Sequence, residues 1–185
     1  MGKQLTSLSN RLIDFIEDQP IFFVATAMKE GRINLSPKGM DTLRIPDPNT
    51  VLWLNLTGSG NETAAHLRAD PRITIMWCAF KGEPRILRVY GTARTYAEGT
   101  DFWERHSGLF PEYAGSRQLV AVRVASVLIS CGMGVPLMEY KGERELLEPW
   151  ASGLGLEGMH AYRQAKNTKS LDGHPTDIPD ENRKP

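Results

Sequence analysis

Short apolar runs, some continuous and some alternating with polar residues, dominate the chain and predict a protein built mainly of β-strands. Residues 21–28 read IFFVATAM and residues 32–36 read RINLS, with Lys29-Glu30-Gly31 as a turn between them. This arrangement predicts a β-hairpin. Later strands are expected at residues 51–57, 72–80, 85–96 and 118–130, with Gly91 as a bulge or bend.

Helical spacing is confined to shorter segments between and beyond these strands. Asn61 is a favourable N-cap for a short helix over residues 62–69, which Asp70-Pro71 ends. An irregular stretch is expected at residues 38–49, which contain Pro46 and Pro48. An N-terminal helix is predicted from the helical spacing of Leu5, Leu8, Leu12, Phe15 and Ile16. Thr6 or Ser7 could cap it, and Pro20 ends it. Other helices are expected at residues 98–106, 144–150 and 156–166.

Six to seven short antiparallel strands with hairpin connections predict a mainly β fold, a small β-barrel with peripheral helices. Closure would remove the exposed strand edges, and the regular helices that a parallel α/β fold needs are missing. We expect a single domain over residues 1–166, followed by a polar, extended and poorly packed tail over residues 167–185.

The charge balance argues against a large class of partners. Among 185 residues, 22 are lysine or arginine and 22 are aspartate or glutamate, so the formal net charge is zero. Without a global positive field we expect neither bulk nucleic-acid binding nor binding to an acidic membrane. The N-terminus lacks a signal-peptide core and no apolar run is long enough to span a membrane, so a cytoplasmic location is expected.

Cysteine and histidine do not form a recognisable chemical motif. Cys78 and Cys131 lie far apart with no metal-ligand spacing, and Cys78 is expected to be a small buried hydrophobe. The four histidines fall in unrelated contexts. We therefore expect no metal site, and no hydrolase nucleophile is recognisable.

A glycine-rich turn between a strand and a helix is the first candidate site. Thr57-Gly58-Ser59-Gly60-Asn61 lets the backbone approach a ligand, and the N–H groups of the first helical turn favour an anion such as a phosphate. The turn matches neither a Walker loop nor a dinucleotide-binding GxGxxG. A tight turn followed by a capped helix, with no ligand, remains the alternative.

Two other segments are candidates beside it. In Asn34-Leu35-Ser36-Pro37-Lys38-Gly39, Lys38 could supply a positive charge to a phosphate or to a reduced ring, or be a solvated turn lysine. The uncharged loop from Cys131 to Pro136 could lie flat against an aromatic ring, with Met133 as a soft packing partner, or be a plain strand exit.

The order of these motifs resembles the pyridoxamine 5′-phosphate oxidase-related FMN-binding proteins. It is carried by FFVATA, GRINLSPKG, LNLTGSGNETAAHLRADPRITIMW, LRVYGTARTY and SCGMGVPLMEYKGER, and the likeness runs from about residue 10 to residue 175. The resemblance implies an FMN-binding split barrel that forms a homodimer, with FMN between the subunits and a small molecule as substrate. The cofactor contacts it implies are Ser36, Lys38, Thr57, Ser59, Gly60, Asn61, Thr63 and Arg88, with Gly132, Met133, Gly134 and Val135 coming from the neighbouring subunit.

The chain departs from true vitamin B6 oxidases at two places. Gly60-Asn61-Glu62 stands where those enzymes have a basic pair, which places Glu62 beside the expected anion. The Arg-x-His pair that contacts substrate near their C-terminus is missing, because Arg163 is followed by Gln164 and Ala165. We therefore expect a flavin-dependent oxidoreductase that does not act on pyridoxine phosphate. A deazaflavin reductase, a non-catalytic flavin-binding protein and an interaction barrel with an empty site remain open.

Overall fold

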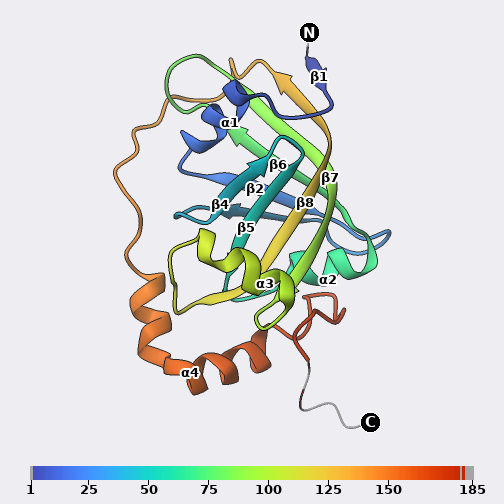
Figure 1. The fold of residues 1–185 in the computed structure, drawn as a ribbon, viewed down its shortest axis with the longest axis vertical. Helices are drawn as coiled ribbons and strands as arrows, with labels where there is room; N and C mark the ends of the chain where they lie inside the picture. The colour runs from blue at the N-terminus through green and yellow to red at the C-terminus, as the bar shows by residue number, and fades with distance from the viewer. Residues whose placement is uncertain (1, 180, 182–185) are drawn as a thin grey trace.

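One curved antiparallel sheet organises the chain in the computed structural model, which describes residues 2–179 and 181 (Figure 1). The sheet has eight strands, in the order β3-β2-β6-β7-β8-β5-β4, with β1 paired to β8 off this path. Because β3 and β4 lie at the two ends of the path, the sheet is not closed. The strands are β1 (Lys3–Leu5), β2 (Phe22–Thr26), β3 (Asn34–Lys38), β4 (Leu43–Asp47), β5 (Thr50–Leu56), β6 (Arg72–Cys78), β7 (Ile86–Ala97) and β8 (Ser116–Ser130).

This architecture confirms the predicted fold class, a mainly β split barrel with peripheral helices. The expectation that closure removes the strand edges is wrong, because β3 and β4 remain as edges of the sheet. The expected hairpin is present, because Phe22 in β2 pairs with Lys38 in β3 and Thr26 pairs with Asn34. The prediction of an irregular stretch at residues 38–49 is wrong, because β4 pairs there with β5. The register shifts between Arg44 and Asp47, around Pro46, and an edge strand tolerates a residue that cannot donate to the ladder.

Four α-helices surround the sheet: α1 (Asn10–Glu17), α2 (Glu62–Ala69), α3 (Asp101–His106) and α4 (Leu147–Lys166). A short 3₁₀ turn, Ser107–Leu109, follows α3. The first helix begins later than predicted, with Ser9 at its N-cap, because Leu5 instead pairs with Val127 as part of β1. The two helices expected near the C-terminus are merged into α4 across a kink at Gly155, whose φ of 64° is unfavourable for a side chain.

Apolar residues on both faces of β5 explain why its sequence is continuously hydrophobic. Val51 and Trp53 face the main core, which also contains Trp77 and residues of α1. Leu52 and Leu54 face a second cluster with Phe110 and Leu119 beneath α3. A strand buried on both faces loses the polar alternation of a half-exposed strand. Cys78 is buried, as predicted.

The predicted irregularity at Gly91 is confirmed. The pairing of β7 with β8 shifts register between Tyr90 and Gly91. A Cβ atom at Gly91 would collide with the carbonyl oxygen of Arg123, so the close approach of the two strands requires glycine here.

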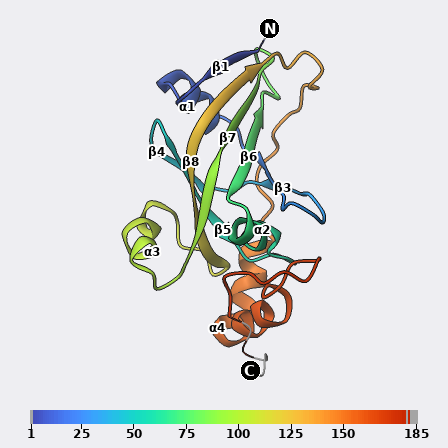
Figure 2. The ribbon, with the colours of Figure 1, turned by 90° about the vertical axis from the view of Figure 1, so that its right-hand side faces the viewer.

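The segment after α4 folds back beneath α2 instead of trailing away (Figure 2). Asn167, Thr168, Ser170 and Thr176 are all buried. The expectation of poor packing is therefore wrong for these four residues, because hydrogen bonds to α4, α2 and the glycine-rich turn compensate for the scarcity of apolar side chains. Among the described residues, no helix is both long enough and apolar enough to cross a membrane.

Candidate functional site

A hollow of about 260 Å³ lies where the C-terminal ends of β3 and β5 meet the turn before α2. Polar groups form much of its wall. Its lining residues are Asn34, Ser36, Lys38, Asn55, Gly58, Ser59, Gly60, Asn61, Glu62, Thr63 and Arg117. The hairpin of β2 and β3 thus brings the SPKG segment beside the glycine-rich turn, two motifs that are separated in the sequence.

A β-bulge brings Arg117 into this wall. Asn55 pairs with Gln118 and Leu56 pairs with Ser116, so Arg117 is the extra residue on β8. A bulge redirects the side chain of the inserted residue. Arg117 is 6% exposed, and its Nη1 donates to Gly60 O at 3.1 Å and to Asn167 Oδ1 at 2.7 Å.

Two cationic side chains line the hollow without a neutralising carboxylate bonded to either. Burial, with the positive charge of Arg117 as the second cause, lowers the pKa of Lys38 from 10.5 to about 8. Burial and then the charge of Arg163 lower the pKa of Arg117 to about 9. Neither residue forms a salt bridge within the described part of the chain; Lys38 Nζ instead lies 3.5 Å from Asn55 Oδ1. A buried, uncompensated positive charge is costly, and a bound anion would relieve that cost.

The turn adds the N-terminus of α2 to this cationic wall. Asn61 occupies the N-cap position as predicted, but its side chain makes no capping hydrogen bond. Its Nδ2 donates to Gln118 Oε1 at 3.2 Å. The N–H groups of the first turn have no partners within the helix, so they favour negative charge at this end of α2.

Hydroxyl and amide groups connect the hollow to the interior. Asn34 Nδ2 donates to Thr63 Oγ1 at 3.1 Å and to Thr26 Oγ1 at 3.3 Å. Thr26 in turn lies 3.1 Å from Nδ1 of the buried His66. This network holds β2, β3 and α2 at a fixed separation around the hollow.

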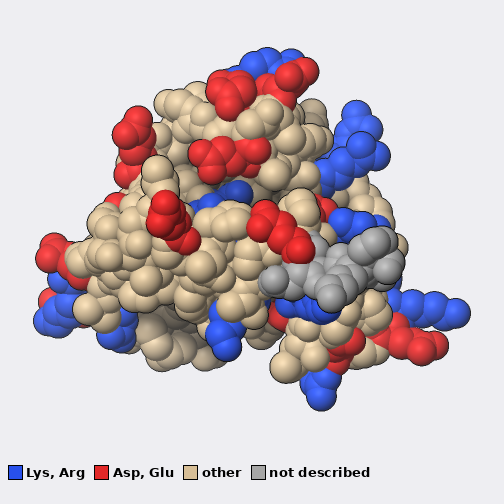
Figure 3. Space-filling view, turned by 90° about the horizontal axis from the view of Figure 1, so that it is seen from below, with Lys and Arg blue, Asp and Glu red and all other residues tan. Residues whose placement is uncertain are grey.

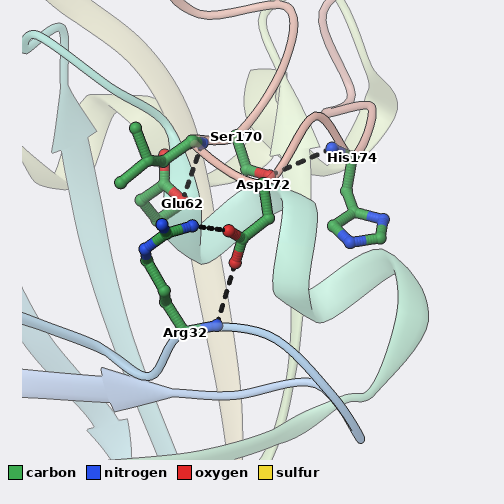
Figure 4. Close-up of polar contacts among 6 residues, drawn as sticks. Arg32, Glu62, Ser170, Asp172 and His174 are labelled. Atoms are coloured by element: carbon green, nitrogen blue, oxygen red, sulfur yellow. Dashed lines mark hydrogen bonds and ion pairs between the residues drawn. The ribbon is translucent and has the colours of Figure 1, made fainter.

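Glu62 lies at the edge of the hollow, and its carboxylate is bonded to the C-terminal segment. The two carboxylate oxygens accept a hydrogen bond from the backbone N–H of Leu171, at 3.0 and 3.2 Å (Figure 4). In the same close-up, Asp172 forms an ion pair with Arg32 and accepts from its backbone N–H at 2.9 Å. The expected repulsion between Glu62 and a bound anion is thus reduced, because the carboxylate accepts a hydrogen bond from the C-terminal segment.

The structure brings six of the twelve sequence-predicted contacts into the wall of one hollow. Ser36, Lys38, Ser59, Gly60, Asn61 and Thr63 all line the hollow. Thr57 is buried beside it, where its Oγ1 accepts a hydrogen bond from Arg163 Nε at 3.0 Å. Arg88 lies elsewhere and donates to Ser130 Oγ at 3.1 Å.

The loop containing Gly132, Met133, Gly134 and Val135 does not line the hollow of its own chain. Gly132 packs against the backbone of Arg85, and Met133 is 83% exposed. The contribution of this loop to the site of a neighbouring subunit remains a prediction.

Two lining residues lie outside every segment singled out from the sequence: Asn55 and Arg117. Asn55 carries a signal that sequence reasoning could have used, because it is a polar residue on the inward face that Val51 and Trp53 define. Arg117 carries no such signal, since its inward direction results from the bulge.

A second, more apolar hollow of about 700 Å³ adjoins the first and shares Lys38 with it. Its wall includes Ile21, Phe23 and Phe80 from the barrel and Met138 and Leu147 from the segment leading into α4. The two hollows together therefore offer a cationic end and an apolar end on either side of one lysine.

Charges are mixed on the molecular face that contains α4. Lysine and arginine are interspersed there with aspartate and glutamate, with no single basic patch (Figure 3). Within the described residues, no group of three or more His, Cys, Asp or Glu side chains could hold a metal ion. The cationic hollow is thus a local feature of a neutral protein.

The fold and this hollow define a class, the split-barrel proteins that carry a polar, cationic pocket beside an open antiparallel sheet. The family model for pyridoxamine 5′-phosphate oxidase matches residues 8–131. The chain is also 35% identical to the pyridoxamine 5′-phosphate oxidase family protein ustO of Aspergillus flavus, over 91% of this chain and 75% of that protein. The chain therefore belongs to the pyridoxamine 5′-phosphate oxidase family.

Solved structures agree on the fold. A variant of HupZ from Group A Streptococcus is 21% identical with a TM-score of 0.53, and the match covers 66% of this chain and 98% of that one. A candidate pyridoxamine 5′-phosphate oxidase from Lactobacillus delbrueckii is 15% identical with a TM-score of 0.52 and the same coverage. At these identities the likeness concerns the arrangement of the strands alone.

Proposed function

We propose that this protein binds FMN and acts as a homodimeric, cytoplasmic oxidoreductase on a small molecule. One observation carries the proposal: Lys38 and Arg117 are cationic side chains that line one hollow beside the N-terminus of α2, and no carboxylate among the described residues is bonded to either. Membership of the pyridoxamine 5′-phosphate oxidase family supports FMN as the anionic ligand.

The residues present fit a phosphate group. Arg117 Nε and Gln118 Nε2 are buried donors without hydrogen-bond partners among the described residues. Such unsatisfied groups are costly unless a ligand or water completes them, and arginine is well suited to phosphate oxygens. Lys38, Arg117, Ser59 and the N–H groups at Asn61 would hold the phosphate, and Ser36 and Thr63 lie where hydroxyl groups of a ribityl chain could bond.

The larger hollow on the other side of Lys38 offers apolar surface for a flat ring. Aromatic and aliphatic side chains favour such a ring, while the polar hollow holds the charged end. When bound, FMN would supply hydride transfer, and the protein would provide orientation, electrostatics and exclusion of water.

A homodimer would complete this site. The exposed loop from Gly132 to Val135 would cover the ring of the partner's cofactor, with Met133 as the packing side chain. Sedimentation of the purified protein tests this part of the proposal, since a monomer would remove the covering loop.

Pyridoxine phosphate is not the expected substrate. Arg163 is the arginine nearest the position of the missing Arg-x-His pair, and its guanidinium donates to Thr57 Oγ1 at 3.0 Å and to Ser116 O at 2.6 Å. An arginine that is bonded to the barrel in this way is not free to hold a substrate phosphate.

The absorption spectrum of the purified protein, followed by titration with FMN, tests the proposal. A yellow protein, or saturable FMN binding to a colourless one, is expected, and Lys38→Ala should release FMN. Unchanged flavin retention in that variant would contradict the assigned site. The neighbouring variant Lys29→Ala, on the exposed turn between β2 and β3, is the matched control.

The same preparation separates the other classes. A mass and spectrum of a deazaflavin in the extracted cofactor would identify a deazaflavin reductase. Bound FMN that NAD(P)H bleaches would identify an enzyme that uses this donor. Bound FMN that neither NAD(P)H nor any small reduced substrate bleaches would indicate a protein that stores or sequesters flavin. A colourless protein that ignores both cofactors would indicate an interaction barrel.

A further inference from the structure

Asn167, the residue that follows α4, joins the C-terminal segment to the cationic hollow. Its side chain is fully buried. Oδ1 accepts from Arg117 Nη1 at 2.7 Å, and Nδ2 donates to Gly58 O at 3.0 Å. Its backbone carbonyl accepts from Thr176 Oγ1 at 2.6 Å. A single amide thus contacts both the arginine and the glycine-rich turn that form the wall of the hollow.

These contacts fix which part of Arg117 stays available. Nη1 is engaged by Gly60 O and Asn167 Oδ1, whereas Nε has no partner among the described residues. The bulge turns the side chain of Arg117 inward, and these hydrogen bonds then set the orientation of its guanidinium. Asn167 therefore holds one edge of the guanidinium and leaves the other donors for a ligand.

The chemical nature of the acceptor matters as much as its position. An amide oxygen accepts a hydrogen bond without a formal charge, so the positive charge of Arg117 is retained. An aspartate at the same place would form a buried ion pair with Arg117 and cancel the charge that an anion needs. An aspartate at residue 167 would therefore weaken anion binding, while its ion pair with Arg117 would contribute to stability.

We infer that Asn167 is a positioning residue that orients Arg117 toward the anionic end of the ligand while leaving its charge uncompensated. The inference rests on the proposed function only in taking FMN as the ligand. Its content is anion binding in the hollow, which inorganic phosphate can also test.

The experiment compares full-length wild type, Asn167→Asp and Asn167→Ala by calorimetric titration with FMN and with inorganic phosphate, alongside thermal unfolding without ligand. Asn167→Asp should weaken both ligands about tenfold or more, while its unfolding temperature falls less than that of Asn167→Ala, because the ion pair with Arg117 offsets the donor that Gly58 O loses. Asn167→Ala should weaken both ligands about tenfold and also lower the unfolding temperature, because Arg117 and Gly58 lose buried partners.

Two control variants lie in the same segment without touching Arg117. Thr176→Val removes the hydroxyl that bonds the Asn167 carbonyl, and should lower the unfolding temperature with little change in affinity. Asp172→Asn breaks the exposed pair with Arg32 and should change neither quantity appreciably. If residue 167 only supports the fold, affinity will instead follow stability across all four variants.

Each outcome bears on a different claim. FMN binding by wild type with unchanged affinity in Asn167→Asp overturns the positioning role and leaves the proposed function intact. Phosphate binding without FMN binding refutes the flavin assignment, and the variants then test Asn167 with phosphate alone. Failure of wild type to bind either ligand overturns both claims.

Discussion

Replacing Lys38 with methionine should make the ligand-free protein more stable while it weakens flavin binding. Methionine keeps much of the length of lysine and removes the ammonium group. In the empty protein that group is buried near Arg117, and its pKa falls from 10.5 to about 8. The folded state therefore disfavours the charged form of Lys38, and this cost is present at neutral pH.

The size of the effect follows from the two pKa values. A lowering from 10.5 to about 8 corresponds to at most about 3 kcal/mol of destabilisation when the group is charged in both states. The unfolded chain binds more protons than the folded chain between these values, so wild-type stability should rise with pH from about 8 to about 10.5. Below about pH 8 the penalty is present in full.

The assay is urea unfolding of both proteins without ligand, at several pH values from about 7 to about 10. Arg117 lies beside Lys38 and its pKa is lowered to about 9, so the two groups titrate as a coupled pair. The stability difference is therefore read near pH 7, where both groups are charged in wild type. We expect Lys38→Met to be more stable by up to about 3 kcal/mol near pH 7, with the difference shrinking as pH rises.

A variant that is less stable than wild type at pH 7, or a stability difference that does not change between about pH 7 and about pH 10, would refute this reasoning. Lys81→Met provides the control. Lys81 is exposed and pairs with Asp18 on the surface, so its replacement should change stability by less than about 1 kcal/mol at any of these pH values.

The same site and fold support further predictions. The dissociation constant for FMN should rise about tenfold per pH unit above the Lys38 pKa of about 8, because only the ammonium form attracts the phosphate; a flat fluorescence-titration profile would exclude a role for Lys38. Glu62→Gln should strengthen FMN binding roughly threefold by removing a negative charge at the edge of the hollow, and weaker binding would mean that its bond to Leu171 matters more than its charge. Gly91→Ala should destabilise the protein by about 2–4 kcal/mol in thermal unfolding, because the added methyl group collides with the Arg123 carbonyl, whereas Gly108→Ala, which meets open space, should cost less than about 1 kcal/mol.

Local patterns in the sequence determined the elements near the site and their neighbours along the chain. The turn Lys29-Glu30-Gly31 between two apolar runs specified the hairpin of β2 and β3, because hairpin pairing depends on residues close in sequence. The strand, glycine turn and helix around Asn61 were predicted for the same reason. Most of the predicted phosphate contacts therefore lie together in the structure.

What the sequence could not determine depends on contacts between distant segments. The inward direction of Arg117 follows from a register shift between β5 and β8, and no local pattern encodes a register. The packing of the segment after α4 depends on side chains such as Asn167, which bonds Arg117 and Gly58. Its polar composition alone suggested a loose tail, because composition does not show which distant groups a residue bonds. The distribution of charge also became informative only in three dimensions. The chain has no net charge, yet folding places Lys38 and Arg117 in one hollow, where no described carboxylate is bonded to either. Burial and proximity, which set these charges apart, are properties of the tertiary structure.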